Sequence, residues 1–244
     1  MSKRIVVIPT YNEIENIERV VKNVFAQDID FDILVVDDSS PDGTAEKIKD
    51  LQKIYKNSLH LIIQNTKEGL GKAYITGFKW ALKHKYDYIF EMDADYSHNP
   101  NDLIRLYNAC SKKNADLSIG SRYVKGVNVI NWPMNRVLLS WIASKYVRII
   151  TQMPIFDTTA GFVCYKRKVL ETINLDKIKF VGYAFQIEMK FKAYTLGFDV
   201  KEIPIIFTDR TKGKSKMDKR IIWEAVFGVI NLKIKSLFFK RQFN

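Results

Sequence analysis

The strongest constraint on the fold is an alternation of short, largely apolar runs and amphipathic segments along residues 1–120. Each run is four or five residues long, as in strands buried on both faces of a parallel sheet. The runs occupy residues 5–8, 33–36, 59–63, 89–92 and 116–120. Because parallel neighbours need a crossover, usually a helix, the pattern predicts an α/β fold: a mostly parallel central sheet with helices on both faces.

Helix starts are expected at Asn12, Thr44, Gly69 and Pro100, from capping residues or breakers ahead of helical apolar spacing. Beyond residue 120 the pattern is looser. Residues 121–133 are expected to form a loop; helices are expected at 134–152, 184–196 and from 218, and strands at 159–165 and 200–207. Since no repeat, low-complexity tract or linker interrupts the chain, we expect one domain over residues 1–244.

Two carboxylates follow the fourth apolar run directly. Asp93 and Asp95 are spaced i, i+2, which puts both on one side of an extended chain. Carboxylates this close repel each other unless a cation neutralises them or one is protonated. Hard oxygen ligands suit Mg²⁺ or Mn²⁺, and a solvated acidic turn is the alternative interpretation. Residues 9–11 and 37–38 also follow strands, so one ligand site is expected at this edge of the sheet.

The charge balance points to an anionic partner. The chain carries 39 basic and 27 acidic residues, a net charge of +12, and its last 44 residues hold 11 basic against 4 acidic side chains. Nucleic acid, phosphorylated small molecules and a membrane surface all fit this excess. No apolar stretch reaches the roughly 18–20 residues of a membrane span, and no signal peptide is evident. Cys110 and Cys164 are expected to be reduced, as in a cytoplasmic protein.

Seven stretches together resemble one known family. Six of them, residues 9–13, 36–44, 69–73, 92–95, 120–123 and 210–216, occur in the order found in family 2 glycosyltransferases, and the seventh is residues 182–189. The set is similar to the dolichyl- or polyprenyl-phosphate mannosyltransferases, in particular to the short catalytic subunits without transmembrane helices. The resemblance implies a single Rossmann-like, GT-A type nucleotide-binding domain. Residues 1–120 would form its nucleotide-sugar half, and residues 121–244 its acceptor and membrane-interface half.

The same resemblance implies roles for individual residues. Asp93, Asp95 and Arg122 would be catalytic, and Asp93 and Asp95 would bind Mg²⁺ or Mn²⁺, with Ser97 where many relatives carry a glutamine ligand. Arg122, Arg136 and Ser140 would hold the acceptor phosphate. The donor site would comprise Pro9, Tyr11, Glu13, Val36, Asp38, Asp42, Lys72, Asp93, Ala94, Asp95, Arg210 and Lys216. Without the resemblance, these stretches are equally typical of strand-ending turns, a solvated basic loop and a helix start.

The implied reaction is an inverting transfer of mannose from GDP-mannose to a polyprenyl or dolichyl monophosphate. A phosphate nucleophile is already ionised, so no general base is needed. His60 and His84 are expected to be structural, whereas His98 lies beside the proposed metal loop.

The lipid acceptor implies peripheral attachment to the cytoplasmic face of a membrane. Residues 134–150 and 227–241 combine apolar and basic side chains, as interfacial helices do, although core packing would explain them equally well. A small anchoring subunit is a further expected partner.

Three alternatives remain open from the sequence. One is a transferase of the same fold that passes glucose or an N-acetylhexosamine from a UDP-sugar to a lipid or polysaccharide. Another is a non-catalytic sensor of sugar nucleotides. The third is a basic nucleic-acid-binding module, which the charge permits but no recognised motif supports, so no nucleic-acid partner is expected.

Overall fold

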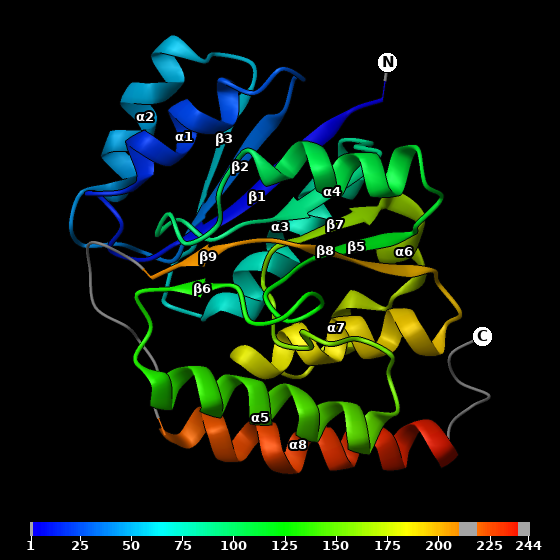
Figure 1. The fold of residues 1–244 in the computed structure, drawn as a ribbon. Helices are drawn as coiled ribbons and strands as arrows, with labels where there is room; N and C mark the ends of the chain where they lie inside the picture. The colour runs from blue at the N-terminus through cyan, green and yellow to red at the C-terminus, as the bar shows by residue number, and fades with distance from the viewer. Residues whose placement is uncertain (1, 210–218, 239–244) are drawn as a thin grey trace.

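The computed structural model describes residues 2–209 and 219–238; within them, the side chains of residues 183, 219–225, 237 and 238 are not described. Its centre is a seven-stranded sheet in the order β3-β2-β1-β4-β7-β5-β8 (Figure 1). The strands are β1 Arg4–Thr10, β2 Asp32–Asp37, β3 Leu59–Ile63, β4 Tyr88–Glu91, β5 Leu117–Ser121, β7 Val163–Lys166 and β8 Val200–Pro204. Only β7 runs antiparallel to its neighbours, so the expected mostly parallel sheet is confirmed. Strands β6 Val129–Ile130 and β9 Phe207–Thr208 form a separate parallel pair.

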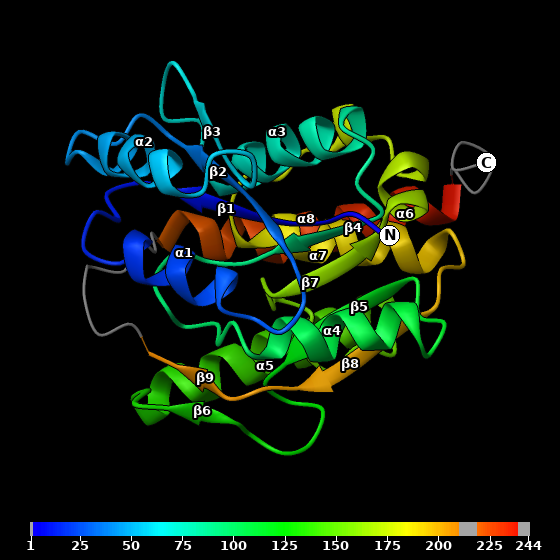
Figure 2. The same cartoon turned by 90° about the horizontal axis from the view of Figure 1, so that it is seen from above.

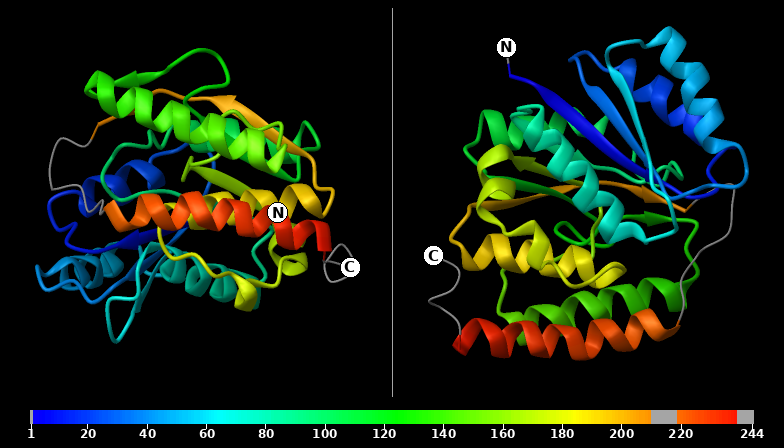
Figure 3. Two further views of the ribbon diagram at one scale, coloured as in Figure 1. Left: turned by 90° about the horizontal axis from the view of Figure 1, so that it is seen from below. Right: turned by 180° about the vertical axis from the view of Figure 1, so that it is seen from behind.

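Helices cover both faces of this sheet, as Figures 1 and 2 show. On one face lie α1 Ile17–Phe25, α2 Thr44–Ile54 and α4 Asp102–Ser111. On the other lie α3 Leu70–Lys83, α5 Met134–Thr151, α6 Arg167–Thr172, α7 Tyr183–Thr195 and α8 Lys219–Phe238, with a short 3-10 turn at Leu175–Lys177. Figure 3 shows α5 and α8 side by side on the outside of α7.

Two apolar cores result from the alternation of side chains along the buried strands. Ile5 and Val7 of β1 belong to the core beneath α3 and α7, whereas Val6 and Ile8 belong to the core beneath α1 and α4. All four side chains are fully buried. A continuous apolar run is therefore what a strand between two helical layers requires. Cys110 in α4 is also buried and unpaired, as expected.

Several predicted boundaries were wrong, and local hydrogen bonds explain the differences. Asn12 adopts a positive φ of 56° and its N–H binds the Ser40 hydroxyl, so α1 begins only at Ile17. Thr44 is the first residue of α2 rather than its cap, because Asp42 Oδ1 accepts both its N–H at 3.0 Å and its hydroxyl at 2.6 Å. Helix α4 likewise begins at Asp102, after a turn, and not at Pro100.

Two predicted strands are shorter in the structure. Strand β7 begins only at Val163, because Ala160 O accepts a hydrogen bond from Lys190 Nζ instead of from a neighbouring strand; Phe162 O still accepts the Gly120 N–H at 2.8 Å. The strand expected at 200–207 is divided into β8 and β9. Among the described residues, no helix is both long enough and apolar enough to cross a membrane.

Candidate active site

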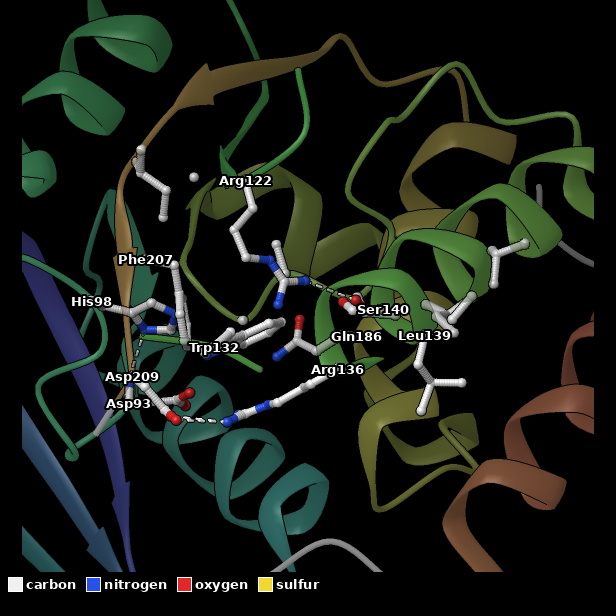
Figure 4. Close-up of a pocket in the computed structure, with 18 of the residues that line it drawn as sticks. Asp93, His98, Arg122, Trp132, Arg136, Leu139, Ser140, Gln186, Phe207 and Asp209 are labelled. Carbon is white, nitrogen blue, oxygen red and sulfur yellow. Dashed lines mark hydrogen bonds and ion pairs between the residues drawn. The ribbon is translucent and has the colours of Figure 1, made fainter. Parts of the chain in front are cut away.

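A cavity of about 390 Å³ lies beyond the carboxyl ends of β4 and β5 (Figure 4). Its polar end is lined by Asp93, Asp95, Arg122, Arg136 and Asp209. Its other end runs between helices and is apolar; it is lined by Leu139, Ile142, Ala143, Tyr146, Val147, Ile187 and Val226. The cavity therefore joins a charged compartment at the sheet edge to an apolar compartment beside α5 and α8.

The acidic pair lies in the loop that follows β4. Asp93 Oδ1 accepts a hydrogen bond from the Tyr74 hydroxyl at 3.3 Å. Asp95 is only 8% exposed, and its Oδ1 accepts the Ser97 N–H at 3.1 Å. Burial and the adjacent Asp93 carboxylate raise the pKa of Tyr74, which therefore stays a neutral donor. Both carboxylates face the cavity, as the sequence predicts for ligands at this edge of the sheet.

The residues present fit a hard divalent cation. Ser97 Oγ is buried and has no hydrogen-bond partner among residues 2–209 and 219–238. Ser97 does not itself line the cavity, but an unpartnered hydroxyl oxygen two residues beyond a carboxylate is a group that could serve as a third oxygen ligand. Within the same residues there is no cluster of three or more His, Cys, Asp or Glu suited to a metal. An ion held by two carboxylates would keep positions open for phosphate oxygens.

His98 lines the same compartment but is not a basic group. Its ring stacks on Phe162 with centroids 4.8 Å apart, and burial lowers its pKa to about 4. Its Nδ1 accepts the backbone N–H of Asp93 at 3.1 Å. In the neutral ring the proton is consequently on Nε2, so His98 can donate a hydrogen bond but cannot accept a proton near neutral pH.

Arg122 and Arg136 both line the cavity, and Trp132 lies between them. The Arg122 guanidinium lies 5.5 Å from the centroid of the Trp132 ring, and that of Arg136 lies 4.1 Å from it. Asp157 binds Arg122, and Asp209 accepts from Arg136 Nη1 at 2.9 and 3.0 Å. Since Ser140 also lines the cavity, the structure brings together all three residues predicted for the acceptor phosphate.

Of the residues predicted for the donor, Asp93 and Asp95 line this cavity, whereas Pro9, Tyr11, Glu13, Val36, Asp38, Asp42, Lys72 and Ala94 do not. The Tyr11 ring carries Lys67 Nζ 3.8 Å from its centroid. Glu13 accepts from Asn16 Nδ2 at 2.9 Å. Pro9 pairs with Val36 in the β1–β2 register.

Asp38 and Asp42 are engaged with backbone groups. The two Asp38 oxygens accept the N–H groups of Glu68 and Gly69 at 2.7 and 2.9 Å, and Asp42 caps α2. Lys72 pairs with Glu68 at 3.5 Å, and Ala94 is buried. Through these hydrogen bonds, Asp38 and Asp42 hold the backbone of the loops that follow the strands. Arg210 and Lys216 lie outside the described residues.

Sequence reasoning missed a buried polar network beneath the cavity. Gln186 Nε2 donates to Glu91 Oε2 at 2.6 Å, and the Tyr165 hydroxyl donates to Glu91 Oε1 at 3.0 Å. Lys190 Nζ donates to Ala160 O at 2.6 Å and to Gln186 Oε1 at 3.3 Å. Burial raises the pKa of Glu91 to about 7 and lowers that of Lys190 to about 8. The only sequence signal was that Gln186 falls within the stretch 182–189.

Trp132, Asp157 and Asp209 were also missed. None of them belongs to a stretch that carries the family resemblance, and their importance depends on contacts with distant residues. Asp157 lies 35 residues from Arg122, and Asp209 lies 73 residues from Arg136.

Comparison with solved structures defines the class of this fold. The structure of glucosyl-3-phosphoglycerate synthase from Mycobacterium tuberculosis in complex with phosphoglyceric acid superposes with a TM-score of 0.69; the match covers 95% of this chain and 80% of that one at 15% identity. A mannosyltransferase from Pyrobaculum calidifontis in complex with GDP-Man and Mn²⁺ superposes with a TM-score of 0.59; it covers 98% of this chain and 75% of that one at 17% identity. The fold is that of the GT-A glycosyltransferases.

Sequence comparison then gives the family. The model for Glycosyl transferase family 2 matches residues 5–173, and the chain belongs to that family. It is 45% identical over 234 residues to a polyprenol monophosphomannose synthase from Mycolicibacterium smegmatis, covering 96% of this chain and 88% of that protein. It is 44% identical over 223 residues to an undecaprenyl-phosphate mannosyltransferase from Micrococcus luteus, covering 91% and 90%. The chain is accordingly a glycosyltransferase, as the resemblance predicted.

Proposed function

We propose that this enzyme transfers mannose from GDP-mannose to a polyprenyl monophosphate, with inversion at the anomeric carbon and dependence on Mg²⁺ or Mn²⁺. One observation carries the proposal: a single cavity joins the acidic pair to two arginines and continues into an apolar compartment. A nucleotide diphosphate, an acceptor phosphate and the first part of a lipid chain fit those three regions in that order. Two relatives with 44–45% identity are named for transfer of mannose to polyprenyl phosphates, which supports the acceptor and the sugar.

The donor would lie at the ends of the strands. Asp93, Asp95 and Ser97 would hold the divalent ion, which, when bound, offsets negative charge on the departing diphosphate. The nucleotide would be contacted by the predicted donor residues Pro9, Tyr11, Glu13, Val36, Asp38, Asp42, Lys72, Ala94, Arg210 and Lys216. The structural neighbour from Pyrobaculum calidifontis binds GDP-Man together with Mn²⁺, which is consistent with this donor and this class of ion.

The acceptor phosphate would lie beside Arg122, Arg136 and the Trp132 ring between them, with Ser140 donating a further hydrogen bond. Two guanidinium groups orient an anion and neutralise its charge. Since a phosphate monoester is ionised at neutral pH, it attacks without a general base. His98 is neutral and its Nε2–H can donate a hydrogen bond but cannot act as a base, which agrees with this chemistry.

The lipid chain requires that the enzyme meet a membrane. The outer surfaces of α5 and α8 expose apolar side chains, among them Leu138, Ile149, Phe227 and Ile234. The same two helices carry basic groups: Lys145, which is exposed, and Arg148 and Lys233, which are partly buried. We infer peripheral attachment at the cytoplasmic membrane face, directly or through a small anchoring subunit, with the chain acting as one catalytic domain.

The test is a transfer assay with purified protein, radiolabelled GDP-mannose and a short polyprenyl phosphate, with and without Mn²⁺. We expect label in the lipid product only when the ion is present, and loss of transfer in Asp95→Ala. The control Asp50→Ala removes a surface carboxylate of α2 and should be fully active. Turnover of a UDP-sugar in place of GDP-mannose would overturn the proposed substrate, and unchanged transfer by Asp95→Ala would overturn the metal site.

A further inference from the structure

The amide of Gln186 faces the cavity in a fixed orientation (Figure 4). Its Nε2 donates to Glu91, and its Oε1 accepts from the Lys190 ammonium. Because an ammonium can only donate, the end of the amide that faces Lys190 must be the oxygen, and the nitrogen therefore faces Glu91. The side chain is 2% exposed, and the network holds it without help from solvent.

Gly161 lies beside this amide and also lines the cavity. A Cβ on Gly161 would lie 3.6 Å from Gln186 Nε2, 3.8 Å from His98 Cε1 and 3.9 Å from Asp93 Oδ1. These distances are ordinary van der Waals contacts, and Gly161 does not have a positive φ. Neither packing nor backbone conformation therefore requires glycine here. What its missing side chain preserves is room between Gln186 and Asp93.

The transferred hexose has to lie in the space between Gln186 and Asp93 if the proposed reaction takes place. For in-line transfer, the anomeric carbon must lie between the departing phosphate, held at Asp93 and Asp95, and the attacking phosphate, held at Arg122 and Arg136. Gln186, His98 and Gly161 line the same cavity as both pairs. A hexose attached to the departing phosphate would consequently rest over Gly161.

We propose that Gly161 forms the floor of the hexose subsite and that Gln186 donates its second N–H to a hydroxyl of the transferred sugar. This inference rests on the proposed transfer from a nucleotide sugar bound at the acidic pair. One N–H of the amide is held by Glu91 at 2.6 Å, which leaves the other for a ligand. A neutral amide suits this role because it can donate a hydrogen bond to a hydroxyl without adding charge beside the diphosphate.

The first test is Gly161→Ala, because a methyl group there should occupy the subsite without disturbing the fold. We expect an unchanged thermal midpoint, an unchanged affinity for GDP in Mn²⁺, and at least a tenfold lower affinity and kcat/KM for GDP-mannose. GDP lacks the sugar and is the internal control. Wild-type kcat/KM for GDP-mannose, or an equal loss of GDP affinity, would overturn the hexose subsite.

The second test identifies the hydroxyl. Gln186→Leu and the wild type are compared with GDP-mannose and its 2-, 3-, 4- and 6-deoxy derivatives. We expect kcat/KM for GDP-mannose to fall about tenfold in Gln186→Leu, and the loss to disappear for the one derivative that lacks the contacted hydroxyl. An equal loss with every donor would mean that Gln186 only supports the fold.

The two proposals fail in different ways. If wild-type protein uses a UDP-sugar and not GDP-mannose, the proposed donor is wrong, and the same comparison is made with deoxy derivatives of that UDP-sugar. If the wild type transfers mannose but neither variant affects it selectively, the proposed function stands and the hexose subsite is wrong.

Discussion

The carboxylate of Asp157 accepts three hydrogen bonds from one residue, Arg122: from Nε at 2.7 Å, from Nη2 at 2.6 Å and from the backbone N–H at 2.9 Å. Both side chains are buried. Burial acts to raise the pKa of Asp157, and the charge and hydrogen bonds of Arg122 outweigh it, so the pKa lies below its usual value of 3.8. Asp157 therefore fixes the guanidinium at the cavity wall.

Asp157→Asn should lower the free energy of unfolding by about 3 kcal/mol at pH 7, because it leaves a buried guanidinium without its counter-charge. A depressed carboxyl pKa gives stability that is present above pH 3.8 and is lost as the pH falls through the folded-state value. Urea unfolding at pH 7 and pH 3 should show the gap between wild type and variant narrowing at pH 3. The control is Asp209→Asn, whose partly exposed pair with Arg136 should cost less than about 1 kcal/mol. A gap independent of pH would contradict this assignment.

Trp132 separates the two arginines predicted to bind the acceptor phosphate. Its indole Nε1 is buried and has no hydrogen-bond partner in the part of the chain that the structure describes. Trp132→Leu should raise the KM for polyprenyl phosphate about tenfold, because the Arg136 guanidinium loses the ring face over which it lies, whereas Asp157 still holds Arg122. The KM for GDP-mannose should not change. Trp141→Leu is the matched control, since Trp141 also carries a cation over its ring but does not line the cavity.

Ser97 offers a test of metal binding that is separate from the carboxylates. If its unpartnered Oγ is a metal ligand, Ser97→Ala should raise the Mn²⁺ concentration for half-maximal activity about tenfold. Removing a buried, unsatisfied hydroxyl should leave the free energy of unfolding without metal unchanged or slightly higher. Activity titrations with Mn²⁺ and urea unfolding in chelator separate the two effects. An unchanged Mn²⁺ requirement would show that the ion is held by Asp93 and Asp95 alone.

The strands of the sheet could be predicted because each buried strand contains a largely apolar run, such as residues 5–8 of β1. The two aspartates after β4 were also recognisable by their spacing, and the family resemblance pointed to them and to the three residues that we propose for the acceptor phosphate, all of which line the cavity. Boundaries failed where a side chain competes with backbone hydrogen bonding. Asp42 caps α2 from two residues before Thr44, and a spacing rule could not choose between these neighbouring polar residues.

The rest of the site depends on long-range pairing that a single sequence does not reveal. The Asp157–Arg122 and Asp209–Arg136 pairs form only after the chain has folded, and acidic residues in loops are usually solvated. The buried Glu91 was hidden inside an apolar strand, where its charge is balanced by Lys190 from α7. Only the three-dimensional structure shows that Gln186 lies between these two groups.

Lys190 should make stability depend on pH in the alkaline range. Burial lowers its pKa to about 8 from an unfolded value of 10.5, and the positive charge of Arg122 acts in the same direction. The carboxylates of Glu91, Asp157 and Glu202 act to raise this pKa but do not outweigh burial. Between these two values the unfolded chain binds more protons than the folded one, so this group's contribution to stability rises with pH. The rise should be on the order of 3 kcal/mol over that window.

Lys190→Met should remove this rise. Urea unfolding from pH 7.5 to 10.5 should show that the stability of the wild type increases relative to the variant as the pH rises. Lys125→Met, which removes an exposed lysine, should follow the wild type at every pH. A difference between Lys190→Met and the wild type that stays constant over this range would show that Lys190 keeps its proton when buried.

The outer surface of α5 and α8 should determine attachment to lipid. Leu138 and Ile149 are 53% and 75% exposed on α5, and their spacing of eleven residues, three helical turns, puts them on one side of the helix. Leu138→Gln with Ile149→Gln should weaken binding to vesicles containing anionic lipid at least tenfold, because two large apolar groups no longer enter the interface. Neither side chain lines the cavity, so turnover of a short, water-soluble polyprenyl phosphate should remain at the wild-type level.

Ile54→Gln with Ile63→Gln is the control: it removes two exposed apolar groups, 68% and 45% exposed, at α2 and β3. Equal vesicle binding by the two double variants in a sedimentation assay would mean that α5 does not face the membrane, and attachment would then have to come from a partner subunit.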